Sequence, residues 1–232
     1  MVKLEKITDE VVSVPNEPGT RRYDDACGTA HALELIGDRW ALLVLRELML
    51  GPRRFSDIRS ELPGVSANVL AQRLKELEQR GLVRRRRLPP PSAAQVYEAT
   101  AWGLEAEPIM QALGRWAARS PHHDPTLPIS AVSILLSFRT MISAKRSKGF
   151  DARVGFRFGA GEYVARIKKG GIKVARGALD GCAVILSAAP ASLAAVVYGG
   201  QPLDLIGVTG DRALAEKFVT LFVLPPKVGA DG

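Results

Sequence analysis

Residues 66–88 read S-A-N-V-L-A-Q-R-L-K-E-L-E-Q-R-G-L-V-R-R-R-R-L, and this stretch decides how the first half of the chain is interpreted. Leu70, Leu74 and Leu77 recur at i, i+4 and i+7, which places them on one side of a helix. Gly81 follows the last apolar position and tolerates the left-handed conformation that commonly ends a helix. The spacing therefore predicts a helix that ends at Gly81 and buries its leucines.

The opposite side of this helix carries amides and a lysine, namely Asn68, Gln72, Lys75 and Gln79. Asn and Gln can pair with adenine edges in the major groove, and Lys can bind guanine or phosphate. Ser66 is placed to cap the helix, because its hydroxyl can accept a hydrogen bond from an unpaired backbone N–H. Taken alone, the pattern also fits an ordinary solvated helix face.

A basic hairpin is predicted directly after this helix. Arg84–Arg87 are four consecutive arginines, prolines at 89–91 must turn the chain, and Gln95–Thr100 has the composition of a strand. A helix followed by such a hairpin is the layout of a winged helix-turn-helix, whose helix enters the major groove and whose wing lies along phosphates. The predicted groove contacts are Ser66, Asn68, Gln72 and Lys75, and the predicted phosphate contacts are Arg73, Arg84, Arg85, Arg86 and Arg87.

The residues that precede this helix complete the arrangement. Residues 39–50 are apolar around most of a helical circumference and predict a core helix that Asp38 caps. A short helix is predicted over 56–62, capped by Ser56, and Pro-Gly-Val at 63–65 forms a tight turn. A short helix, a three-residue turn and a longer helix make up a helix-turn-helix.

Composition and charge favour a folded protein with a polyanionic partner. The 232 residues are 47% hydrophobic and carry a net charge of +8. Residues 39–87 hold 12 Lys/Arg against 5 Asp/Glu, so the excess is concentrated in the proposed DNA-binding region. Two cysteines are too few for a disulfide framework, and no signal peptide or transmembrane run is apparent. We therefore expect a cytoplasmic protein with no membrane association.

The periodicity of the hydrophobic residues changes in the second half of the chain. Residues 129–144 predict a helix with one strongly apolar face, and residues 153–175 alternate with a period of two around the Gly170-Gly171 hairpin signal. An apolar run at 183–186 suggests a strand buried on both faces. With later helices at 190–198 and 211–221, separated by a short strand, this predicts an α+β domain. Its sheet is expected to be antiparallel, with helices on one side.

The expected domain organisation follows from these patterns. The predicted segments are a flexible N-terminal lead (1–24), a winged-helix domain (25–120), a proline-rich linker (121–128), an α+β domain (129–225) and a tail (226–232). His122, His123 and Asp124 lie in the linker without the spacing of a preorganised metal site, so no metal is predicted there.

Several motifs resemble the HxlR family of bacterial transcription regulators. They are G-D-R-W-A-L-L-V-L-R-E-L (37–48), G-P-R-R-F-S-D-I (51–58), L-P-G-V-S-A-N-V-L-A-Q-R-L-K-E-L-E (62–78), G-L-V-R-R (81–85), V-Y-E-A-T-A-W-G (96–103) and L-G-R-W (113–116). The resemblance runs from about residue 25 to residue 120. It implies a dimeric winged-helix protein that binds double-stranded DNA and acts as a repressor or an activator.

The helix expected after the wing, over 100–119, is part of the dimer interface that this resemblance implies. Ile109, Leu113 and Trp116 form an apolar stripe on it, and Pro108 predicts a kink or a break. The stripe is expected to pack against a second subunit. The alternative is ordinary core packing within one subunit.

Cys27 stands at the start of a helix predicted over 27–36, where backbone N–H groups favour a thiolate. Some HxlR relatives use a cysteine at this place to sense oxidants or electrophiles, so the resemblance makes Cys27 a candidate redox sensor. Those relatives often have proline next, whereas this chain has Gly28. The alternative is an unreactive thiol near the dimer interface.

The second half resembles the sterol carrier protein type 2-like fold, through the order of its elements and the phrases A-S-L-A-A-V-V-Y-G-G (191–200) and T-G-D-R-A-L-A-E-K-F (209–218). The resemblance implies an apolar cavity that holds a lipid or another apolar effector. The candidate lining residues are Leu135, Phe138, Val184, Leu186, Leu193, Val197 and Phe222. The alternative is that these side chains fill the core.

The sequence contains no phosphate-binding loop, no serine nucleophile elbow and no histidine partner pattern, so no enzymatic activity is predicted. No cofactor is implied. The leading hypothesis is a homodimeric DNA-binding transcription regulator, modulated by an apolar ligand or by Cys27 oxidation. The rival hypothesis is a lipid-binding or lipid-transfer protein whose N-terminal half is an interaction module.

Overall fold

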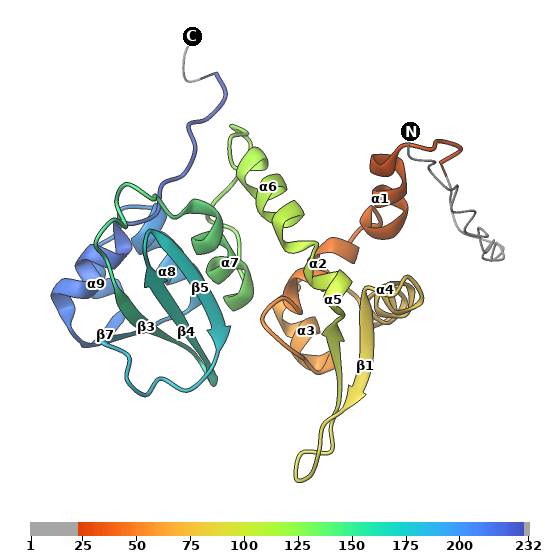
Figure 1. The fold of residues 1–232 in the computed structure, drawn as a ribbon, viewed down its shortest axis with the longest axis horizontal. Helices are drawn as coiled ribbons and strands as arrows, with labels where there is room; N and C mark the ends of the chain where they lie inside the picture. Colours follow the sequence, from red (N-terminus) through yellow and green to blue (C-terminus); the bar gives the residue numbers. More distant parts are fainter. Residues whose placement is uncertain (1–22, 230–232) are drawn as a thin grey trace, which may run out of the picture. The chain divides into compact units, whose positions relative to one another are not determined.

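The computed structural model describes residues 23–229, within two compact units, Met1–Asp38 and Arg39–Gly232. The first unit contains α1 (Gly28–Ile36), shown in Figure 1. Most of the expected N-terminal lead lies outside the described residues. Among residues 23–229, no helix is long and apolar enough to cross a membrane.

The second unit begins with a winged helix-turn-helix, confirming the expected order. Leu45, Ile58, Leu70 and Leu74 are almost fully buried and join its helices in one core. The elements are α2 (Ala41–Glu47), α3 (Phe55–Glu61), α4 (Ala67–Gln79), β1 (Val83–Arg87), β2 (Gln95–Ala99), α5 (Ala101–Leu104) and α6 (Glu107–Ala117).

Two expected helix starts are wrong by a few residues. The expected cap of the core helix was Asp38, but α2 begins after Trp40, whose φ of 79° is left-handed. The expected cap of the short helix was Ser56, but α3 begins after Arg54, because the Asp57 carboxylate accepts a hydrogen bond from the Arg54 backbone N–H at 3.3 Å. An acidic side chain that reaches back in this way satisfies a donor that the helix cannot.

The base of the wing is closed by a small set of contacts. Gly81 has a φ of +73°, as its role at the end of α4 requires. Thr100 Oγ1 donates to the Gly81 carbonyl at 2.7 Å and accepts from the Gly103 N–H at 3.0 Å. A Cβ at Gly103 would lie 2.0 Å from the Leu82 carbonyl oxygen, so the start of α5 can approach the first strand only without a side chain there.

The helix expected after the wing is broken, as Pro108 predicts. α5 ends at Leu104, and α6 starts at Glu107 with Pro108 in its first turn. Proline is tolerated at this place because the first N–H groups of a helix have no intrahelical partner.

The second half of the unit is a five-stranded sheet covered by helices (Figure 1). The helices meet the sheet in an aromatic cluster, in which Phe138 stacks on Phe222 with centroids 4.4 Å apart and meets Phe156 at 5.8 Å. The elements are α7 (Ala131–Met141), β3 (Ala152–Phe158), β4 (Gly161–Lys168), β5 (Gly171–Arg176), β6 (Val184–Ser187), α8 (Pro190–Tyr198), η1 (Leu203–Leu205), β7 (Gly207–Gly210) and α9 (Arg212–Val219).

The sheet is mixed, so the expectation of an antiparallel sheet is wrong. Its order is β5-β4-β3-β6-β7, and β3 pairs with β6 in parallel. Residues 177–183 carry the chain from β5 back across the sheet to the far side of β3, which brings β6 in with the direction of β3. This segment packs on Gly155: a Cβ there would lie 3.0 Å from Leu179 and 3.2 Å from Cys182.

Polar contacts join α7 to the winged helix-turn-helix within the second unit. Ser130 caps α7 and donates to the Glu47 carboxylate of α2 at 2.7 Å. Arg139 of α7 binds the Glu107 carboxylate of α6 at 2.6 Å. The two halves of this unit are therefore connected by specific side-chain contacts in addition to the linker.

Candidate nucleic-acid interface

The α4 helix has the two faces that its sequence predicts. Leu70, Leu74 and Leu77 are at most 1% exposed. The Ser66 hydroxyl caps the helix by accepting from the Val69 N–H at 3.3 Å. A rigid helix anchored by its leucine side can hold its outer face in a defined position.

The outer face of α4 presents Asn68, Gln72 and Lys75, which are all exposed. Gln72 Nε2 donates to Glu76 at 3.0 Å, so this amide is oriented along the helix in the absence of a ligand. Arg73 is only 14% exposed and pairs with the same glutamate. The structure thus brings Asn68, Gln72 and Lys75 together on the exposed face of α4. The Arg73 side chain is mostly buried on the flank of the helix.

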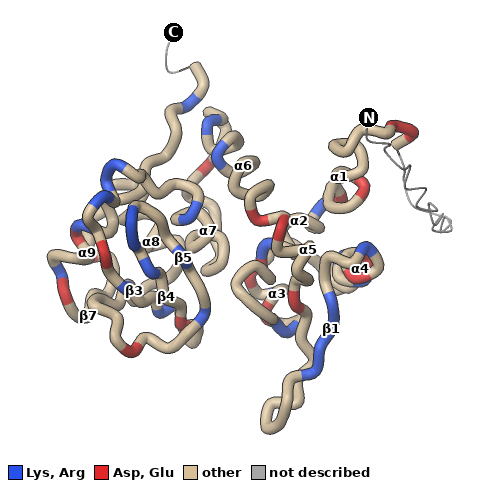
Figure 2. Tube along the Cα trace, viewed as in Figure 1, with Lys and Arg blue, Asp and Glu red and all other residues tan. Residues whose placement is uncertain are grey.

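The arginines of β1 divide between the two faces of the wing. Three of the four pair with carboxylates, and Arg87 donates to the Ala93 carbonyl at 3.0 Å. Arg84 and Arg86 share Glu98 of β2, at 2.6 and 3.1 Å. Arg85 reaches back to Glu78 near the end of α4, at 2.7 Å. Figure 2 shows the resulting basic stripe along β1.

An open hollow of about 410 Å³ lies on the wing. It is lined by Arg85, Arg86, Arg87, Ala93 and Gln95. Three of the five lining residues are arginines, so this part of the wing is basic and suited to phosphate oxygens, because the planar guanidinium can bind an oxyanion through two N–H groups.

The contact between Arg85 and Glu78 has an electrostatic consequence. The hydrogen bond from Arg85 lowers the pKa of the Glu78 carboxyl, and the same bond raises the pKa of Arg85. Both groups therefore stay charged at neutral pH. A phosphate that approaches the wing meets a guanidinium already held by an anion.

The role of Arg53 and Arg54 was not foreseen from the sequence. Arg53 adds a third backbone segment to the wing through an isolated β-bridge: its N–H donates to the Tyr97 carbonyl at 2.9 Å, and its carbonyl accepts from the Tyr97 N–H at 2.8 Å. Its side chain is 6% exposed and reaches Glu61 at 3.4 Å. Arg54 is exposed and donates to Ser92 in the wing loop at 3.2 Å. The Arg-Arg dipeptide before Phe55 was the visible signal, but its pairing depends on the folded wing.

Glu47 is a second unforeseen feature. Its side chain is fully buried, and its Oε1 accepts from Ser130 and lies 2.9 Å from Arg46. Burial raises the pKa of the Glu47 carboxyl, although the nearby Arg46 and Arg53 oppose this. Its Oε2 has no hydrogen-bond partner among the described residues. A buried carboxylate of this kind is costly unless its contacts persist.

The apolar stripe of α6 is exposed. Ile109 is 48%, Leu113 44% and Trp116 74% exposed, and α6 buries none of its own residues. These side chains therefore do not form a core within the described residues of the chain. Such an exposed stripe of large apolar residues is typical of an interaction surface.

Cys27 lies immediately before α1 as an exposed, free cysteine. Hydrogen bonds from the backbone of Thr29 and Ala30 lower the pKa of its thiol. This increases the fraction present as thiolate, which is the reactive form.

Most of the candidate cavity residues fill the core of the second half. Leu135, Phe138, Val184, Leu186, Leu193 and Phe222 are at most 4% exposed, and Val197 is half-buried. A groove of about 680 Å³ lies elsewhere, at the ends of the parallel strands β3 and β6. It is lined by Glu61, Ile129, Ala131, Arg157, Phe158, Gly159, Ser187, Ala188, Ala189 and Pro190.

The helix pair α3–α4, the wing behind it and the exposed amide face define this part of the chain as a winged helix-turn-helix of the kind found in DNA-binding proteins. The model of the HxlR-like helix-turn-helix family matches residues 35–124.

Sequence relatives agree with this match. The HTH-type transcriptional regulator YodB of Bacillus subtilis is 40% identical over 86 residues, which is 37% of this chain and 77% of YodB. An HTH-type regulator of Methanothermobacter thermautotrophicus is 34% identical over 97 residues, 42% of this chain and 74% of that protein. The solved reduced form of YodB covers 43% of this chain and 100% of its own, at 35% identity and a TM-score of 0.39. The chain belongs to the HxlR-like helix-turn-helix family.

Proposed function

We propose that the protein is a DNA-binding transcription regulator. The observation that carries the proposal is the exposed face of Asn68, Gln72 and Lys75 on a helix held by three buried leucines, with an arginine-lined wing beside it. Amides on the helix can distinguish bases, and the wing arginines can bind phosphates irrespective of sequence. The relatives that match are HTH-type transcriptional regulators, which supports the same function.

In this proposal, the protein acts as a homodimer, and α6 forms the interface between the two subunits. Ile109, Leu113 and Trp116 supply a continuous apolar surface that a second copy would cover. A two-fold dimer would place its α4 helices in successive major grooves, about 34 Å apart, and would read an inverted repeat. We also propose the domain boundaries that the sequence predicts, including a linker at 121–128. The proposed location of the protein is the cytoplasm.

Two inputs are proposed to modulate the dimer. The first is oxidation of Cys27, supported by its exposure and its lowered thiol pKa. The second is an apolar effector of the sterol-carrier-like second domain. An effector among the core side chains would have to displace the stacked rings of Phe138 and Phe222, whereas the groove beside Ile129 and Phe158 is already open.

The decisive experiment is selection of genomic DNA fragments by the purified protein at near-physiological salt. We expect recovery of a few fragments that share an inverted repeat, and loss of this selectivity in the Gln72→Ala variant. Recovery of random fragments only, released steeply as salt rises, would contradict sequence-specific reading. Co-purification of an apolar molecule without specific DNA affinity would favour the rival lipid-binding function.

A further inference from the structure

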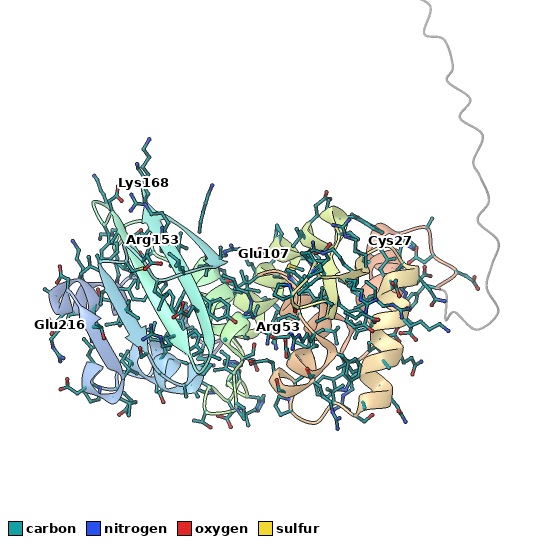
Figure 3. The ribbon with its side chains drawn as sticks, turned by 90° about the horizontal axis from the view of Figure 1, so that it is seen from below. Cys27, Arg53, Glu107, Arg153, Lys168 and Glu216 are labelled. Carbon is teal, nitrogen blue, oxygen red and sulfur yellow. The ribbon has the colours of Figure 1, made fainter. Side chains whose placement is uncertain are left out.

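A second basic surface lies on the sheet, apart from α4 and the wing. Residues 143–176 contain ten Lys/Arg and only two Asp/Glu. On β4, Tyr163, Ala165 and Ile167 are buried under the helices, so Arg166 and Lys168 point to the opposite, open face. Lys168 extends from the sheet away from its helices (Figure 3).

The strand register concentrates these charges in a row. Arg153 of β3 lies opposite Arg166 of β4, and Arg166 lies opposite Lys173 of β5. Neighbouring strands are about 4.8 Å apart, so three cations follow one another across the sheet at close intervals. Like charges directly opposite each other are destabilising, and this cost falls when an anion binds between them.

More lysines border the row at one end of the sheet. The Ser147 hydroxyl donates to the Gly170 carbonyl at 3.2 Å, which holds the loop after α7 against the β4–β5 turn. This brings exposed lysines of the two segments to the same end, namely Lys145, Lys148, Lys168 and Lys169.

Internal carboxylates neutralise little of this surface. Asp151 pairs with Arg166 at 2.6 Å, and Glu162 pairs with Arg157 at the other end of the strands. Within residues 143–176, the five lysines form no salt bridge. Arg153 donates to the Ala178 carbonyl at 3.1 Å, which leaves its charge unneutralised. An ordinary solvated face intersperses both signs of charge, whereas this surface has an excess of positive charge.

We propose that the face of β3–β5 turned away from the helices, centred on Arg153, Arg166, Lys168 and Lys173, binds the phosphate backbone of duplex DNA. It would act as a second, sequence-independent contact beyond the one proposed for α4 and the wing. A membrane surface is the other polyanion of this kind, but peripheral helices and loops bind membranes by inserting apolar side chains. None of the exposed large hydrophobic residues lies within 143–176, all of which the structure describes.

The test uses full-length protein and a fluorescent duplex of random sequence, titrated at several salt concentrations. The Lys168→Gln/Lys173→Gln variant removes two exposed charges from the face. The Arg212→Gln/Lys227→Gln variant removes two exposed charges elsewhere and is the matched control. Each phosphate contact contributes about 0.9 to the slope of log affinity against log salt, so the test variant should lose about 2 units of slope. Between about 50 and 200 mM salt this changes the affinity ratio roughly tenfold.

The outcomes separate this proposal from the proposed function. Equal slopes for wild type, test variant and control overturn the second contact, and do so whether or not an inverted repeat is selected. A slope lost only in the test variant, without any inverted repeat, supports the second contact and contradicts the regulator function. Absence of duplex affinity at low salt overturns both. Vesicles containing phosphatidylserine complete the test: binding of vesicles but not of duplex, lost in the test variant, would overturn DNA as the occupant.

Discussion

Arg85 and Glu78 allow a direct test of the wing as a phosphate-binding element. The Arg85→Ala change removes a guanidinium from the wing hollow, and the Glu78→Gln change keeps it but removes the anion that holds it at 2.7 Å. We expect opposite effects on DNA affinity: Arg85→Ala should weaken all duplexes equally, and Glu78→Gln should strengthen binding to all of them. Both side chains are at the surface, so both variants should remain folded.

The magnitude follows from the counterions that one phosphate contact releases. One contact contributes about 0.9 to the salt slope, so Arg85→Ala should lower the slope by about 0.9. Over a fourfold change in salt, this alters the ratio of affinities by about 3.5-fold. Glu78→Gln should leave the salt slope at or above that of the wild type, because Arg85 no longer has to leave the Glu78 carboxylate in order to bind a phosphate.

The assay is fluorescence anisotropy with an operator duplex and a scrambled duplex, at about 50 and 200 mM salt. The Arg212→Ala variant is the matched control, since Arg212 also pairs with a surface carboxylate, Asp204, at 2.6 Å. If Arg85→Ala leaves the slope unchanged, or weakens only the operator, then Arg85 does not contact phosphate as argued.

Three further predictions follow from the structure. Gln72→Ala should cost about 1–3 kcal/mol of discrimination at one base position, measured by competition among operator variants, while affinity for random DNA is retained; unchanged discrimination would place the reading face elsewhere. Trp116→Glu should raise the dimer dissociation constant at least about tenfold in analytical ultracentrifugation, against exposed Leu127→Glu as control; an unchanged constant would exclude α6 as the interface. Burial raises the pKa of Glu47, so the folded state holds this proton more tightly than the unfolded state, and that contribution to stability is lost as pH rises through the raised pKa. As pH rises, the free energy of unfolding of the wild type should therefore fall relative to that of Glu47→Gln, as measured by denaturant titration at several pH values. A difference between the two proteins that does not change with pH would contradict a raised pKa.

The features predicted correctly from the sequence depend on short-range patterns. The leucine spacing of α4, the glycine at its end and the proline-rich turn of the wing are each confined to one short stretch of the chain, and each is confirmed. The break before α6 likewise follows from Pro108 itself. Patterns of this kind are strong because local geometry alone determines which residues share a face.

The features that were missed depend on contacts between distant residues. Glu47 falls within an apolar helix pattern, and its burial makes sense only with Ser130, 83 residues away. The parallel pairing of β6 depends on how residues 177–183 cross the sheet, which no periodicity encodes. The carboxylate partners of the wing arginines follow from the strand register and from the angle between β1 and α4.

The closed base of the wing has a consequence for how such a chain can change in length. Hydrogen bonds connect Thr100 to Gly81, 19 residues before it, and to Gly103, 3 residues after it. The space beside Leu82 admits no side chain at Gly103. The turn at 88–94 carries no comparable restriction, because its residues are mostly exposed. Insertions and deletions should therefore accumulate at the tip of the hairpin. The glycine and threonine positions at its base provide fixed points from which the module can be aligned across sequences of unequal wing length.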